Sequence, residues 1–206
     1  AMGLIFLLIF TIFYALRREQ EYLYYALQMA CGFFIVLELC NFWDTFGSCL
    51  IRLKVLGLAW AAVNVFHPIF LHRIYGLERR KTERTLWAFL ALTVVLLLTI
   101  TGRPADLLQV NVFIAVTTCI GLYNISCHLY AIYRRRRYSL IFGFFGIAVI
   151  LGAMHDGLVY LAKFTDHPIS LFGYAFRDHM IFHYMATMLY TGTALLLVFR
   201  FINMAN

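Results

Sequence analysis

A short charged segment between two long apolar runs constrains this chain more than any other feature. Residues 2–16 carry no charge, and the stretch from Tyr22 to Leu39 is apolar apart from Gln28 and Glu38. Between them lies Arg17-Arg18-Glu19-Gln20-Glu21, a run of polar side chains. Polar side chains between two apolar segments of this kind belong at a membrane–water boundary, so the segment predicts a tight turn between two membrane helices.

The composition supports an integral membrane protein. Hydrophobic residues make up 63% of the 206 residues and charged residues only 13%, whereas charged residues are about a quarter of a typical soluble domain. The apolar segments are continuous and do not alternate, which favours helices over a β-barrel. The fold class predicted is an all-α membrane protein, a single domain over residues 1–206. Its seven expected spans are 2–16, 22–43, 53–72, 85–101, 107–133, 139–163 and 179–201.

The basic residues predict the orientation, because cytoplasmic loops of membrane proteins are enriched in Lys and Arg. Five basic residues lie on one side: Arg52, Lys54, Arg103, Lys163 and Arg177. Twelve lie on the other: Arg17, Arg18, Arg73, Arg79, Arg80, Lys81, Arg84, Arg134, Arg135, Arg136, Arg137 and Arg200. The second side is expected to be cytoplasmic, with the N-terminus outside and the C-terminus inside. The net charge of +7 is interpreted as topology determinants near anionic lipid head groups, so no nucleic-acid partner is predicted.

Three sequence motifs resemble a known family. The segment Arg17-Arg18-Glu19-Gln20-Glu21-Tyr22-Leu23-Tyr24-Tyr25-Ala26-Leu27 is similar to the first cytoplasmic turn of the bacterial seven-transmembrane receptors with diverse intracellular signalling modules. His155-Asp156-Gly157-Leu158-Val159-Tyr160 and Phe199-Arg200-Phe201 stand where that family has related motifs in spans six and seven. His155 and the histidines of span seven depart from the family pattern.

The resemblance implies a sensory domain of the bacterial inner membrane, multi-pass and without catalytic activity of its own. It implies a periplasmic domain before span one and an output module after span seven, of the histidine kinase or diguanylate cyclase type. The first span is short, so the chain is expected to be a fragment from which both modules have been removed. The expected partners are the lipid bilayer, these two modules and a second copy of the chain, and Asp156 and Arg200 are expected to take part in signalling.

Ionisable residues inside membrane spans are functional candidates, because their burial in lipid is costly. His179 and His183 are four residues apart and share one helix face, and a depth estimate places His155, Asp156 and Glu38 near the same outer level. Three interpretations stay open: a hydrogen-bond network that joins the helices, a site for a zinc or copper ion, and a pH-responsive cluster.

A second polar layer is expected closer to the cytoplasm. It consists of Asn64 and His67 in span three and of Asn124 and His128 in span five. These residues are interpreted as polar groups that hold helices together, with a second ligand site or haem ligation as the alternatives. Cys40 and Cys49 flank the second, external loop, and whether they form a disulfide stays open.

A second functional class remains as the alternative. Seven-helix membrane hydrolases of the ceramidase and progestin-receptor type also carry a His-x-x-x-His pair on the last span and use a zinc-bound water as nucleophile. They need a further histidine on span two, where this chain offers only Glu38. The sequence therefore favours the sensory domain.

Overall fold

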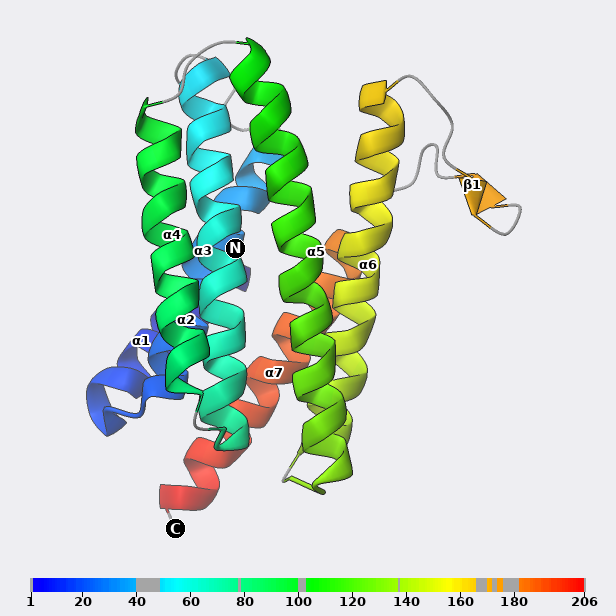
Figure 1. Ribbon diagram of the computed structural model, residues 1–206. Coiled ribbons are helices and arrows are strands. Elements are labelled where there is room, and N and C mark those ends of the chain that lie inside the picture. The colour runs from blue at the N-terminus through cyan, green and yellow to red at the C-terminus, as the bar shows by residue number, and fades with distance from the viewer. Residues whose placement is uncertain are drawn as a thin grey trace. The chain divides into compact units, whose positions relative to one another are not determined.

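The described part of the chain forms seven helices and one small hairpin in a computed structural model (Figure 1). The helices are α1 (Met2–Arg17), α2 (Gln20–Leu39), α3 (Cys49–Tyr75), α4 (Arg80–Thr99), α5 (Arg103–Tyr133), α6 (Ser139–Thr165) and α7 (Phe182–Ala205). Between α6 and α7, the strands β1 (Ser170–Leu171) and β2 (Tyr174–Ala175) pair antiparallel, with Ser170 opposite Ala175.

The structure describes the backbone of residues 2–39, 49–77, 79–99, 103–136, 138–165, 170–171, 174–175 and 182–205. It describes side chains within 4–35, 51, 54–77, 79–99, 115–136, 138–152, 154–155 and 190–203.

The helices support a membrane protein. Within the described residues, three helical stretches have the length and hydropathy of a membrane span, namely Lys54–Tyr75, Arg80–Thr99 and Ala115–Tyr133. Leu4–Arg17 and Ser139–Gly152 are shorter apolar helical stretches. Each of the seven predicted spans overlaps one helix, so the all-helical prediction is confirmed, while seven crossings and their orientation stay predictions. The largest difference at a helix start is in α4, which begins at Arg80 and not at residue 85, because its first turn is polar.

The chain divides into two compact units, residues 1–112 and 113–206. In the first unit α2 packs against both α1 and α3, and α3 also packs against α4. Its core is aromatic: the rings of Phe10 and Tyr25 meet edge to face at 4.6 Å, and Tyr25 lies 5.6 Å from Phe70. Tyr22 and Tyr25 enter this core from the first two turns of α2, and both side chains are fully buried.

The second unit relies on close approach of helices at glycines. A Cβ atom added to Gly143 would lie 2.6 Å from Cδ1 of Ile132, and one added to Gly146 would overlap the imidazole of His128. Since both neighbours are on α5, Gly143 and Gly146 let α6 approach that helix, as their small size predicts. On the other side α6 packs against α7, where Phe145 lies beside Gly192.

Two turns end their preceding helices with the same hydrogen bonds. After α3, the N–H of Leu77 donates to the carbonyl of His72 and the N–H of Gly76 donates to that of Arg73. This is the Schellman motif, whose residue after the helix adopts a left-handed conformation; Gly76 does so with φ of 63°. After α5, Arg136 and Arg135 donate in the same pattern to Ala131 and Ile132, and Arg135 has φ of 48°.

Candidate functional site

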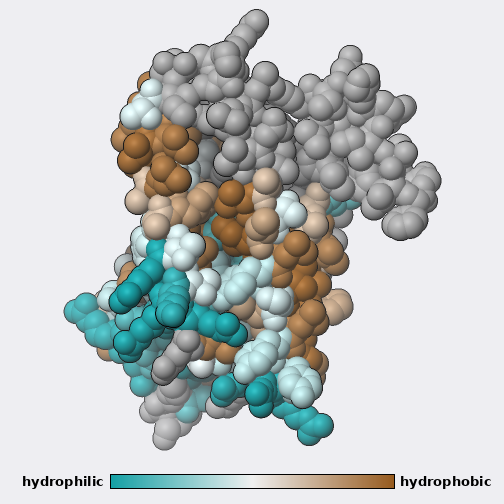
Figure 2. Space-filling model, viewed as in Figure 1, coloured by the Kyte–Doolittle hydropathy of each residue, from teal (hydrophilic) through white to brown (hydrophobic). Residues whose placement is uncertain are grey.

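The best-defined polar site lies where α3 ends and α4 begins; hydrophilic side chains also gather on the surface there (Figure 2). Arg73 donates two hydrogen bonds to Glu83, from each terminal nitrogen to a different carboxylate oxygen, both at 2.7 Å. Its Nε donates to Oε1 of Gln20 at 2.6 Å. Nδ1 of His72 donates to Oε1 of Glu83 at 3.0 Å. Gln20, His72, Arg73 and Glu83 are called the Arg73 cluster below, and they join α2, α3 and α4.

Local structure explains why these residues meet. The Schellman turn at Gly76 reverses the chain, so the last turn of α3 faces the first turn of α4. Arg73 lies in the last turn of α3 and Glu83 in the first turn of α4, which are the helix ends where a positive and a negative side chain respectively are favoured. The helix dipoles and the ion pair therefore favour the same arrangement.

The Arg73–Glu83 pair and His72 are largely shielded from solvent, whereas Gln20, at the edge of the cluster, is exposed. The side chain of Glu83 is 13% exposed and that of Arg73 28% exposed, and His72 is buried. The guanidinium also lies 6.0 Å from the ring of Tyr24 on α2, within cation–π range. A shielded, bidentate arginine–carboxylate pair is among the stronger polar contacts in proteins, so the cluster can hold three helices in one relative position.

A second polar contact joins α2 and α3, at a distance from the Arg73 cluster along both helices. Nδ1 of His67 on α3 lies 3.1 Å from Nε2 and 3.3 Å from Oε1 of Gln28 on α2. One hydrogen bond is made there, and its direction depends on the histidine tautomer. Gln28 is 3% exposed. The α2–α3 interface therefore contains polar contacts at two levels, inside packing that is otherwise rich in aromatic side chains.

The contact between Gln20 and Arg73 bears on the topology. It brings the turn between α1 and α2 to the same end of the first unit as the turn between α3 and α4. The basic residues Arg17 and Arg18 thus lie at the same end as Arg79 and Arg80. The sequence predicts this arrangement, because successive spans cross the membrane in opposite directions and the first and third turns then lie on the same side.

The predicted outer cluster falls largely outside the described side chains. His155 is a half-buried residue of α6, but only the backbone of Asp156, His183 and Glu38 is described, in α6, α7 and α2. His179 lies outside the described residues altogether, and so does Cys40. The side chain of Cys49 is likewise outside the described set. Among the described residues, no group of three or more His, Cys, Asp or Glu side chains is placed to hold a metal ion. The three interpretations of the outer cluster, a zinc or copper site among them, therefore stay open, and so does the pairing of Cys40 with Cys49.

The second predicted layer is divided between the two units. In the first, His67 contacts Gln28, and Asn64 donates to the carbonyl of Trp60 on its own helix at 3.1 Å. In the second, Asn124 and His128 are both buried on α5, with exposed fractions of 4% and 1%. The ring of His128 packs against the backbone at Gly146. His67 and His128 thus each act in the packing of their own unit, which fits the interpretation as groups that hold helices together.

Sequence reasoning missed the Arg73 cluster. The sequence marks Arg73 only as one of several basic residues at the expected cytoplasmic boundary, and the expected start of span four at residue 85 leaves Glu83 outside the spans. Glu83 is, however, an acidic residue within a basic stretch, ten positions after Arg73. That spacing across a helical hairpin was the available indication of an ion pair.

Comparison of the chain with protein-family models, with curated proteins and with solved structures finds no match.

Proposed function

We propose that the chain is the membrane-embedded sensory domain of a bacterial receptor, a multi-pass protein of the cytoplasmic membrane. In this proposal a stimulus at the outer face changes the packing of the helices, and α7 relays the change to a cytoplasmic output module of the histidine kinase or diguanylate cyclase type. The domain acts as a homodimer and has no catalytic activity of its own.

The observation that carries the proposal is the Arg73 cluster. Many of the other contacts of the first unit are apolar, and apolar contacts are non-directional. A bidentate pair between Arg73 and Glu83 is instead either made or broken. Transitions between discrete polar arrangements at helix ends are a common basis of two-state switching, and the cluster involves three of the four helices in its unit.

The packing of α7 is suited to relaying such a change. Thr193, Ala194 and Leu197 are buried on one side of the helix, whereas Leu195 and Phe199 are exposed. The helix packs against α6, with Gly192 beside Phe145, so a shift of α6 changes the position of α7. Arg200 is half-buried near the C-terminal end of the same helix, where it can respond to that shift.

In the same proposal the outer cluster receives the stimulus. His155, Asp156, His179 and His183, with Glu38, supply the imidazole and carboxylate groups that bind a zinc or copper ion or respond to pH. The proposal does not depend on which of these two stimuli applies.

The test measures output in cells that express the chain within its natural reading frame. Glu83→Gln should change basal output, because it breaks the bidentate pair while keeping the shape of the side chain. Asp156→Asn and Arg200→Ala should also change it, through the outer cluster and the exit of α7. The matched control is Arg84→Gln, an exposed charge one residue from Glu83.

Membrane abundance of each variant is measured alongside by immunoblot of membrane fractions. The proposal requires altered output at normal abundance for Glu83→Gln, with the control unchanged. Unaltered output in all three test variants, over a full titration of zinc and of external pH, would remove the proposed coupling.

A further inference from the structure

The turn between α5 and α6 exposes a concentrated positive charge. Arg134, Arg135 and Arg136 are consecutive and exposed, and within the described part of the chain none of them pairs with a carboxylate. No Asp or Glu occurs in the sequence between Asp106 and Asp156. The charge of this turn is therefore not neutralised by neighbours in its own helical hairpin.

The backbone at this turn accommodates an arginine where glycine is normally favoured. Arg135 occupies the left-handed position of the Schellman motif, with φ of 48°, and Tyr138 is also left-handed, with φ of 62°. Residues other than glycine are disfavoured in the left-handed conformation, because their Cβ atom contacts the backbone. The chain therefore keeps the guanidinium of Arg135 at the tip of the turn in spite of a conformational cost.

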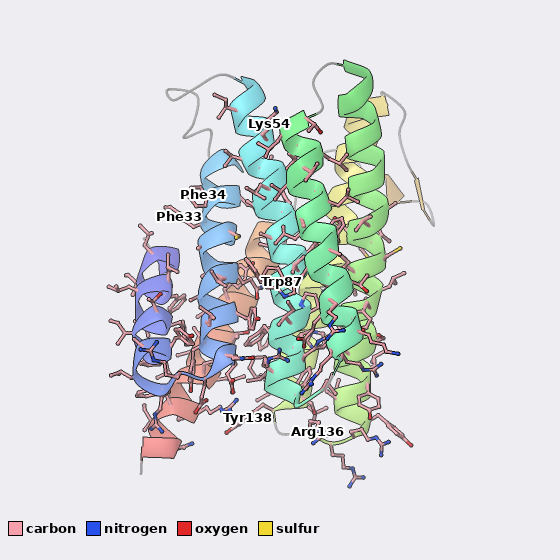
Figure 3. All side chains as sticks on the ribbon, turned by 60° about the vertical axis from the view of Figure 1, so that its left-hand side comes forward. Phe33, Phe34, Lys54, Trp87, Arg136 and Tyr138 are labelled. Carbon is pink, nitrogen blue, oxygen red and sulfur yellow. The ribbon has the colours of Figure 1, made fainter. Side chains whose placement is uncertain are left out.

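The surroundings of the turn fit a lipid–water interface. Arg136 and Tyr138 lie at the turn, just beyond the end of α5 (Figure 3). The guanidinium of Arg134 lies 5.6 Å from the ring of Tyr130, and Tyr133 is 80% exposed. Apolar side chains are exposed directly behind these groups, with Leu140 71% exposed. Tyrosines at the head-group level with apolar residues behind them are typical of a membrane interface.

We propose that this turn is a binding surface for the phosphate groups of anionic phospholipids. Arginine binds phosphate oxygens through paired N–H groups. Three exposed arginines with no carboxylate partner among the described residues, beside exposed apolar side chains, match a lipid that offers a phosphate and acyl chains together. This role goes beyond fixing the orientation of the chain and is independent of the proposed sensory function. A lipid is favoured over RNA because the turn connects two apolar helices.

The test uses the purified full chain in detergent, titrated with an equimolar mixture of phosphatidylglycerol and phosphatidylcholine, with retained lipids identified by native mass spectrometry. The test variant is Arg134→Gln/Arg135→Gln/Arg136→Gln. Its matched control, Arg79→Gln/Arg80→Gln/Lys81→Gln, removes the same charge from exposed positions at the turn between α3 and α4. Each arginine is expected to contribute about fivefold to retention of the anionic lipid, from about 1 kcal/mol per basic residue at an anionic surface.

The expected result is preferential retention of phosphatidylglycerol by the unaltered protein, lost in the test variant and kept in the control. Replacement of the same three arginines by lysine keeps the charge but not the paired N–H groups, so part of the preference should remain. That result separates a charge effect from misfolding of the glutamine variant. Equal loss in the control would overturn the proposal. So would displacement of the lipid by excess inorganic phosphate, or tighter binding of a single-stranded RNA oligonucleotide than of the lipid.

Discussion

The turns after α3 and after α5 have the same backbone hydrogen bonds and use opposite chemistry. At the first, Gly76 takes the left-handed position without strain, and the flanking charges of Arg73 and Glu83 pair with each other. At the second, Arg135 takes the same position, and it and its neighbours direct no ion pair to any described residue. The motif fixes the course of the chain in both cases, so the difference between the turns lies in the side chains.

That difference separates two ways of using charge at the end of a helical hairpin. Charges that pair internally and are shielded can stabilise the packing of helices, and their loss should change stability. Exposed charges that lack partners contribute little to stability and are available for binding outside the chain. The two turns should therefore respond differently to substitution.

The largest effect is expected for Glu83→Ala. This change leaves Arg73 and His72 without their shared acceptor in a shielded site, and loss of one partner of such a pair costs about 3 kcal/mol. Unfolding of the purified protein by denaturant in mild detergent would measure the free energy difference. Arg84→Ala, at an exposed position beside it, should stay within about 0.5 kcal/mol of the unaltered protein. If both variants unfold alike, the Arg73 cluster does not stabilise the first unit.

A smaller loss is expected in the second unit for Gly146→Ala. The new methyl group would overlap the buried ring of His128, and overpacking of this kind costs about 2 kcal/mol. The control is Gly192→Ala, where the added Cβ would lie at an ordinary 3.5 Å from Cε2 of Phe145. Higher helix propensity should make that change neutral or stabilising by about 0.5 kcal/mol. A thermal melt of each variant distinguishes the two outcomes, and equal melting would show that His128 yields to the new methyl group.

Much of the helical arrangement could be predicted from sequence, because apolar runs and the polar breaks between them are local features. The turn at Arg17 and Arg18 is an example: α1 ends at Arg17, Arg18 is left-handed with φ of 58°, and α2 begins at Gln20. The close approach at Gly143 and Gly146 was also predictable, since small residues in a membrane helix indicate it.

The Arg73 cluster was not predictable by the same reasoning. Its members come from three helices, and the contact between Gln20 and Arg73 joins residues that are far apart in the sequence. Hydropathy marks where a helix leaves an apolar environment, but it does not mark where the helix begins. For α4 the two points differ by five residues, and Glu83 lies between them.

The smallest expected effects come from exchanging the left-handed residues of the two turns. Arg135→Gly should stabilise the protein by about 1 kcal/mol, because glycine relieves the conformational cost at this position. Gly76→Ala should destabilise it by a similar amount: no atom lies within 4 Å of the added Cβ, so the backbone conformation with φ of 63° is the only source of strain. Both free energies are measured by denaturant unfolding in the same detergent.

Retention of phosphatidylglycerol should fall only in Arg135→Gly, so that this variant gains stability as it loses lipid. If Arg135→Gly loses both stability and lipid retention, or gains both, the arginine is not kept at the turn for binding at the expense of stability.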